Sequence, residues 1–115
     1  MQVQILHNPR CSKSRATLEL LRQNGVEPEI VLYLETPPDA KLLASILSKL
    51  KMQARELLRK GQPEYAQMGL ADPRLSDDQL IAAMVKSPVL IERPIVLANG
   101  KARIGRPPEA VLQIL

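Results

Sequence analysis

The fold is decided by residues 3–34, VQILHNPRCSKSRATLELLRQNGVEPEIVLYL. Val3 to Leu6 is rich in β-forming residues, and Glu29 to Leu34 is a nearly continuous apolar run, so both predict strands. Ser12 to Asn24 has the apolar spacing of a helix that stops at Gly25. The inward positions of that helix are expected to be Ala16, Leu18, Leu20 and Leu21. A strand, a helix and a strand this close together predict a βαβ unit with two parallel strands.

Residues 37–87 are predicted to form a helical block. Thr36 is expected to cap its first helix, with Pro37 at the first helical position. A second, short helix is predicted over Ala54 to Lys60. A third is predicted from Ser76 to Lys86, because its first residues form a capping box.

The chain then returns to strand. Asn99-Gly100 separates the β-rich runs Pro94 to Ala98 and Lys101 to Gly105, which is the strongest short-range signal for a hairpin. Pro107-Pro108 is expected to begin a last helix, with its inward positions at Val111, Leu112, Ile114 and Leu115. This order of elements matches an α/β, thioredoxin-like fold. Its mixed four-stranded sheet is made of the βαβ unit and a C-terminal ββα unit, with the helical block as an insertion.

The length of 115 residues predicts a single domain over residues 1–115, with the insertion at about 37–87. The one Cys cannot form an internal disulfide, and an unpaired thiol suits a reducing compartment. The N-terminus lacks the pattern of a signal peptide, and no apolar run is long enough to span a membrane. We therefore expect a cytoplasmic monomer.

The formal net charge is +4, which is compatible with an anionic partner. The chain has no Trp or Phe and only Tyr33 and Tyr65 as aromatic residues, and its basic residues are scattered. Nucleic acid is disfavoured, because single strands need stacking side chains and duplexes need a basic stripe. A small anionic ligand explains the excess charge, and a margin of solubility explains it equally well.

Cys11 is the main candidate for chemistry. A lone Cys is most often inert core, but this one follows Asn8-Pro9-Arg10 at the junction of a loop and a helix. Unpaired amides and the positive end of the helix dipole stabilise a thiolate there, and the same helix start can hold an oxyanion. The amides, Arg10, Lys13 and the Ser14 hydroxyl are expected to lower the pKa of the thiol and make it a nucleophile.

The sequence offers few other groups that can take part in chemistry at Cys11. His7, the only histidine, can tune the thiol or order the loop, and the second role is favoured. One His and one Cys are too few for a metal site, so neither a metal nor a bound cofactor is expected. No second Cys is present to resolve an adduct, so a redox cycle requires an external thiol.

Three arginines stand at unusual positions. Arg59 ends the second predicted helix, whereas Arg93 and Arg106 each precede a proline at an edge of the hairpin. In a thioredoxin-like fold the loop before the third strand lies beside the helix that carries the cysteine, so Arg93 is expected to point at Cys11. A proline in that loop can be cis. The remaining arginines that we considered are expected to be solvated on the surface, namely Arg22, Arg55 and Arg74.

The sequence resembles the glutaredoxin-dependent arsenate reductases of the ArsC type, and among them the shorter members called YfgD-like. The resemblance covers nearly the whole chain. It is carried by His7-Asn8-Pro9-Arg10-Cys11-Ser12-Lys13-Ser14-Arg15, Tyr33-Leu34-Glu35-Thr36-Pro37-Pro38, Arg55-Glu56-Leu57-Leu58-Arg59-Lys60, Glu92-Arg93-Pro94-Ile95-Val96 and Arg106-Pro107-Pro108-Glu109. Ser12-Lys13 differs from the smaller, uncharged residues of well-studied members, so another oxyanion or thiol partner stays open.

The resemblance implies an enzyme of arsenical resistance in which Cys11 forms a thiol–arsenate adduct. Glutathione as co-substrate and glutaredoxin as partner then release arsenite. It also implies that Arg59, Arg93 and Arg106 bind the oxyanion, and that His7 and Ser14 support the thiolate. Guanidinium groups suit this task because each makes paired N–H contacts to oxygen.

Two other functions fit the same residues. One is a redox-responsive regulator similar to Spx, which binds RNA polymerase. Against it, such regulators often carry a Cys-x-x-Cys switch that this chain lacks. The other is a monothiol module that removes glutathione from proteins through Cys11.

Overall fold

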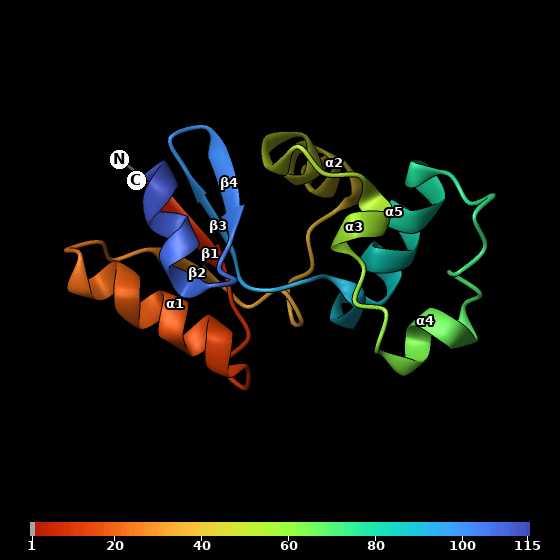
Figure 1. Ribbon diagram of the computed structural model, residues 1–115, viewed down its shortest axis with the longest axis horizontal. Coiled ribbons are helices and arrows are strands. Elements are labelled where there is room, and N and C mark those ends of the chain that lie inside the picture. Colours follow the sequence, from red (N-terminus) through yellow and green to blue (C-terminus); the bar gives the residue numbers. More distant parts are fainter. Residues whose placement is uncertain (1) are drawn as a thin grey trace. The chain divides into compact units, whose positions relative to one another are not determined.

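A computed structural model describes residues 2–115. The chain divides into two compact units, which are treated separately. Residues up to Thr36 and from Arg93 onward form the unit that contains the strands, here called the sheet unit (Figure 1). Residues Pro37–Glu92 form the helical unit. The boundary at Glu92 lies a few residues beyond the end of the helical block predicted from the sequence.

The sheet has four strands in the order β2-β1-β3-β4. β1 pairs in parallel with β2 and antiparallel with β3, and β3 pairs antiparallel with β4. The strands are Val3–Leu6 (β1), Glu29–Val31 (β2), Ile95–Ala98 (β3) and Lys101–Ile104 (β4). The predicted mixed sheet is therefore confirmed, and so is the hairpin. Asn99 and Gly100 both have positive φ, which is the conformation that a two-residue hairpin turn requires.

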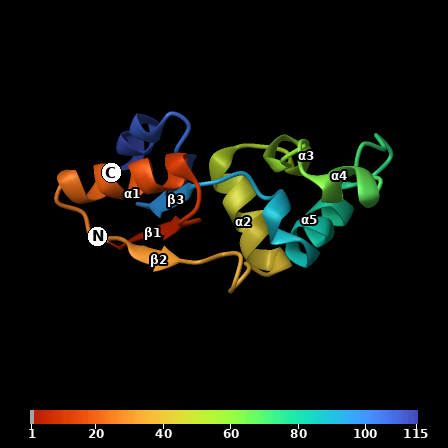
Figure 2. The same cartoon turned by 90° about the horizontal axis from the view of Figure 1, so that it is seen from below.

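Two helices pack against the same face of this sheet (Figure 2). They are α1 (Ser12–Gln23) and the C-terminal helix η2 (Pro108–Ile114). The core between them and the sheet consists of Val3, Ile5, Leu18, Leu21, Val96, Ala98, Val111 and Ile114. The last helix is of the 3-10 type, and Asn99 Nδ2 of the hairpin donates a hydrogen bond to the Ile114 carbonyl at 2.8 Å.

The buried side of α1 differs from the prediction. Ala16 is exposed and Leu20 is only half-buried, whereas the polar Ser14 and Thr17 are fully buried beside Leu18 and Leu21. Ser14 faces inward because its hydroxyl binds His7 and the Asn8 amide, whereas the Thr17 hydroxyl bonds back to the Lys13 carbonyl and its side chain lies against Gly105. The helix ends where predicted, with Gly25 at φ +76°.

The second strand is shorter than predicted. Only Glu29–Val31 pairs with β1, because the backbone turns at Leu32, whose carbonyl accepts from the amides of Glu35 and Thr36 at 2.9 Å. Ile30 on this edge strand and Leu34 after the turn are 39% and 44% exposed. An apolar run thus continues past the end of the sheet, and part of it faces solvent.

The helical unit contains more and shorter helices than predicted. Its elements are Ala40–Leu50 (α2), Ala54–Leu57 (α3), Pro63–Gln67 (α4), Asp77–Lys86 (α5) and the 3-10 turn Pro88–Leu90 (η1). The predicted cap of α2 is wrong. Asp39 accepts from the Leu42 amide, whereas the Thr36 hydroxyl is turned to the Leu32 carbonyl. The capping box at Ser76 is confirmed.

The second predicted helix also ends early. α3 stops at Leu57 because Leu58 forms an isolated antiparallel bridge with Ile91. The Arg59 amide donates to the Leu90 carbonyl, and the Glu92 amide donates to the Leu57 carbonyl. This pairing joins residues more than thirty positions apart, so helical periodicity alone did not reveal it.

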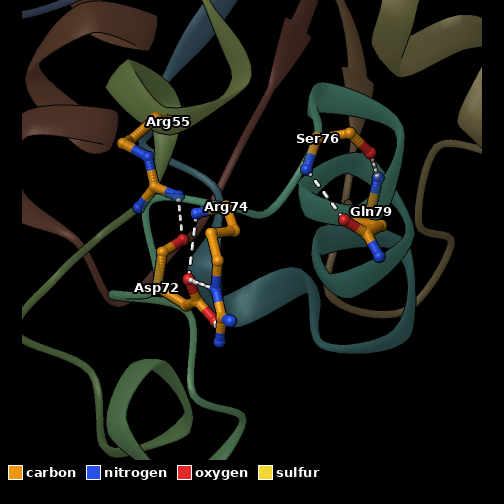
Figure 3. A network of polar contacts seen from close by, with 5 residues as sticks. All are labelled: Arg55, Asp72, Arg74, Ser76 and Gln79. Carbon is orange, nitrogen blue, oxygen red and sulfur yellow. Dashed lines mark hydrogen bonds and ion pairs between the residues drawn. The ribbon is translucent and has the colours of Figure 1, made fainter.

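Arg55 corrects another prediction. Its side chain is half-buried and clamps the segment before α5. Nη1 donates to the Leu70 carbonyl at 2.8 Å. Nη2 donates to the Asp72 carbonyl, also at 2.8 Å (Figure 3). Arg74 is exposed, as predicted, and pairs with the Asp72 carboxylate at 2.9 Å. We call the group of Arg55, Leu70 and Asp72 the Arg55 clamp. Within residues 2–115, no helix is long and apolar enough to cross a bilayer.

Candidate active site

The first candidate residue, Cys11, is the N-cap of α1. Its carbonyl accepts the first helical hydrogen bond, from the Arg15 amide, at 3.0 Å. Its own amide donates to the Asn8 carbonyl at 3.0 Å, which closes the turn after β1. The side chain is 8% exposed. Cys11 thus lies at the start of the helix, as predicted, and keeps a small opening to solvent.

The surroundings of Cys11 lower the pKa of its thiol. Burial raises this pKa, but several groups together outweigh it. In order of effect they are the amide of Ser14, the charge of Arg93, the amide of Lys13 and the charge of Arg106. Amides of the first helical turn lack partners within the helix, so a thiolate at the N-cap takes up their hydrogen bonds. The thiolate fraction at neutral pH is therefore larger than that of an ordinary Cys.

Two of the three predicted arginines lie in the same unit as Cys11. Arg106 Nη2 is 3.8 Å from Cys11 Sγ, and Arg106 Nε donates to the Arg93 carbonyl at 2.9 Å. The peptide bonds Arg93-Pro94 and Arg106-Pro107 are both cis. The carbonyl of one arginine therefore holds the guanidinium of the other beside the sulfur, and both positive charges act on the thiol.

Gly105 brings Arg106 close to α1. The Gly105 amide donates to the Pro94 carbonyl at 3.0 Å. A Cβ at position 105 would overlap Thr17 Oγ1 and lie 2.8 Å from Pro94 Cγ. Thr17 cannot easily yield, because it is fully buried and its hydroxyl donates to the Lys13 carbonyl at 2.8 Å. Only glycine fits this close approach of the backbone after β4 to α1, whose N-cap is Cys11.

His7 and Ser14 form a buried pair behind the loop. His7 Nδ1 is 2.7 Å from Ser14 Oγ, which also accepts from the Asn8 amide at 3.0 Å. Burial, and then the charges of Arg22 and Arg15, lower the pKa of His7. The pair joins the loop after β1 to the first turn of α1.

The other two predicted residues have different settings. Arg10 is exposed, and its amide donates to Asn8 Oδ1 at 3.0 Å. None of the hydrogen bonds in residues 2–115 joins the Arg10 side chain to Cys11. Arg59 belongs to the helical unit, where it follows α3, is half-buried and approaches the Val89 carbonyl with Nη1 at 3.4 Å.

This arrangement can hold a small oxyanion next to a nucleophile. The helix start offers amides, Arg93 and Arg106 offer positive charge, and the thiol of Cys11 is poised to ionise. In residues 2–115, no three His, Cys, Asp or Glu side chains are grouped so that they can bind a metal ion.

Sequence reasoning missed two positioning residues, Gly105 and Thr17. The signal for Gly105 was the Gly-Arg-Pro run after the hairpin, because a glycine directly before a candidate ligand often marks a close backbone approach. Thr17 gave no such signal, since a threonine within a helix is usually solvated or weakly bonded to its own backbone.

Comparison with known proteins adds the family. The sequence model of the ArsC family matches residues 6–114. The chain is 64% identical to the Escherichia coli K12 protein YfgD, over 99% of this chain and 97% of that one. It is 49% identical to an arsenate reductase of Neisseria meningitidis serogroup A, over 99% and 98% of the two chains. The solved structure of an arsenate reductase from Vibrio cholerae has 50% identity and a TM-score of 0.97, and the match covers 100% of this chain and 98% of that one.

Proposed function

Because the chain belongs to the ArsC family, as the resemblance predicted, we propose that it is a thiol-dependent oxidoreductase that reduces arsenate to arsenite. The observation that carries this proposal is the position of Cys11, whose sulfur lies at the start of α1 and 3.8 Å from Arg106 Nη2. Relatives that share about half of its residues are named arsenate reductase, which supports the same reaction here.

In the first step, the Cys11 thiol condenses with dihydrogen arsenate. An S–As bond forms, one As–O bond breaks, and the oxygen leaves as water with the thiol proton and a proton of arsenate. Arsenic stays in oxidation state +5. Arg93 and Arg106 stabilise the oxyanion, and the amides of Lys13 and Ser14 stabilise the thiolate before attack.

In the second step, an external thiol attacks the sulfur of Cys11. The S–As bond breaks, and its electron pair stays on arsenic, which becomes arsenite in oxidation state +3. Two sulfurs are oxidised to a mixed disulfide, which balances the two electrons gained by arsenic. The proton of the attacking thiol goes to arsenite. A second thiol then frees Cys11, so each turnover consumes two thiols and yields one disulfide and one water.

The remaining assignments belong to this proposal. Glutathione is the co-substrate, glutaredoxin reduces the mixed disulfide, and the reducing cytoplasm keeps Cys11 as a thiol. The resemblance implies an oxyanion-binding role for Arg59 as well. His7 and Ser14 position the loop, because their bond holds the turn that presents Cys11, and Arg10 adds positive charge next to it.

The experiment is an arsenate reduction assay with the full chain, glutathione, glutaredoxin, glutathione reductase and NADPH. Arsenite is quantified directly, alongside arsenate-dependent NADPH oxidation. Cys11→Ser should abolish both signals, whereas Ser12→Ala, which changes an exposed neighbour, should leave them near the level of the original chain. Turnover by Cys11→Ser would refute the role of the nucleophile.

A second outcome points to another function. If arsenite does not form but glutathionylated peptides are reduced through Cys11, the chain is a monothiol module. In that case arsenate and sulfate should not inhibit the reaction, since no oxyanion is bound beside Cys11.

A further inference from the structure

A pocket borders the loop that presents Cys11, and none of the proposed oxyanion ligands Arg59, Arg93 and Arg106 lines it. It has a volume of about 370 Å³, within the range of small-ligand sites. Residues 7–10 form one wall, and the turn after β2 forms the other, with Leu32, Leu34 and Glu35. All of these residues belong to the sheet unit.

The lining of this pocket has opposite charges and an apolar wall. Arg10 lies on the first wall and Glu35 on the second, and both are exposed. Among residues 2–115, neither side chain has a hydrogen-bond or ion-pair partner, unlike Arg22 and Arg74, which pair with acidic neighbours. Leu34 is 44% exposed and gives the pocket an apolar wall.

We propose that this pocket binds the peptide part of the thiol that reduces the Cys11 adduct. Arg10 binds a carboxylate of the thiol, Glu35 binds its ammonium group, and its methylene groups lie against Leu34. The ligand class is a small peptide thiol that carries both charges, of which glutathione is an example. This inference rests on the proposed function, because it supplies the external thiol that the proposed second step consumes.

The dimensions fit this assignment. Arg10 precedes Cys11, so their Cα atoms are about 3.8 Å apart. An extended tripeptide spans up to roughly 10 Å. If the carboxylate at one end binds Arg10, the thiol of the central residue can therefore reach the adjacent Cys11. The chain has a single sulfur nucleophile and cannot resolve its own adduct, so a dedicated place for a second thiol meets a need that the oxyanion ligands do not.

The test separates binding from chemistry. S-methylglutathione cannot react, so its binding to the Cys11→Ser protein can be followed by amide NMR. We expect saturable shifts of residues 7–10 and 32–35. Arg10→Ala and Glu35→Gln should each weaken the affinity roughly two- to fivefold, as expected for exposed charge pairs. The matched controls Lys101→Ala and Glu19→Gln, at exposed positions outside the pocket, should not.

A second measurement uses the active protein. Glu35→Gln should raise the KM for glutathione by a similar factor and leave the KM for arsenate unchanged, because Glu35 has no role in holding the oxyanion. An S-methyl cysteine derivative with both ends blocked lacks the two charges and should not produce the NMR shifts.

Three results would overturn the inference. The first is an absence of shifts in the pocket at millimolar S-methylglutathione. The second is equal binding of the blocked derivative, and the third is reduction of the Cys11 adduct by a protein partner without any small thiol. Each of these results leaves arsenate reduction by Cys11 intact. The proposed function fails separately, if no thiol supports arsenite formation while S-methylglutathione still binds.

Discussion

Two arginines of this chain, Arg55 and Arg106, differ in what their guanidinium groups contact. Arg55 directs Nη1 and Nη2 to backbone carbonyls of one loop in the helical unit. Arg106 donates from Nε to the Arg93 carbonyl, and its Nη2 lies 3.8 Å from the Cys11 thiol. The first arrangement fixes a loop, whereas the second holds a positive charge where a sulfur ionises. The contacts of these two arginines, rather than their places in sequence motifs, therefore distinguish a structural role from a role at the thiol.

Arg106→Ala should give the largest effect. We expect arsenate reduction to fall about 10- to 100-fold, because a hydrogen bond to a charged group contributes about 1.5–3 kcal/mol. The pKa of Cys11 should rise, since one of the charges that lower it is gone. Both are measured, as initial rates and as the pH dependence of Cys11 alkylation, with Lys101→Ala as the control. An unchanged rate and midpoint would contradict the role of Arg106.

Gly105→Ala tests what holds Arg106 in place. The new Cβ would overlap Thr17 Oγ1, so we expect a loss of about 1–3 kcal/mol in the free energy of unfolding, measured in urea. The alkylation midpoint should rise too, because the loop must move away from α1. Gly61→Ala is the matched control, since a Cβ there meets nothing within 4 Å. If Gly105→Ala and Gly61→Ala are equally stable, the close approach of Gly105 to Thr17 does not contribute to the free energy of unfolding.

Arg55→Ala should lower the stability of the fold without changing the pKa of Cys11, in contrast to Arg106→Ala. It leaves two carbonyls without the donors that the Arg55 clamp supplies, so unfolding should become easier by about 1–2 kcal/mol. The alkylation midpoint of Cys11 should not move. Arg74→Ala removes only an exposed ion pair with Asp72 and should have a smaller effect on stability. A shift of the Cys11 midpoint in Arg55→Ala would break the distinction between the two arginines.

The smallest expected effect concerns His7 and pH. Burial, then Arg22 and Arg15, lower the pKa of His7, so the unfolded chain binds this proton more readily than the folded chain. Its contribution to stability is therefore complete above about pH 6.5 and is lost as the pH falls toward the folded pKa, by at most about 1.4 kcal/mol per pH unit. Urea unfolding between pH 5 and 7 measures this slope, which should be shallower in His7→Gln. An equal slope in both proteins would assign it to other groups.

Local patterns predicted the parts of the fold that local forces determine. The βαβ order, the hairpin at Asn99-Gly100 and the capping box at Ser76 follow from apolar spacing and turn chemistry, and the structure has all of them. The early end of α3 did not follow, because Leu58 pairs with Ile91 far along the chain. The cap of α2 was mispredicted at Thr36, because the turn at Leu32 engages the Thr36 hydroxyl and Asp39 caps the helix instead.

The candidate site likewise has one feature that the local sequence predicted and others that depend on contacts between distant segments. Cys11 was predictable, because the residues around it mark a loop that opens a helix. The bond between Arg106 and the Arg93 carbonyl was not, since it depends on how the two ends of the hairpin meet. The buried side of α1 was mispredicted for a related reason. Ser14 and Thr17 face inward to meet His7 and Gly105, and no rule of helical apolarity favours them there.

Cys11 is the only cysteine of the chain, so it cannot form a disulfide within one molecule. Any form of the protein that is modified at this thiol must therefore carry an added group there, such as oxygen, another thiol or a second copy of the chain. The intact mass of the protein then identifies that group, whether an arsenic oxyacid, a peptide thiol or a whole partner. Cells quenched in acid after exposure to an oxidant would yield a direct record of what reacts at this position.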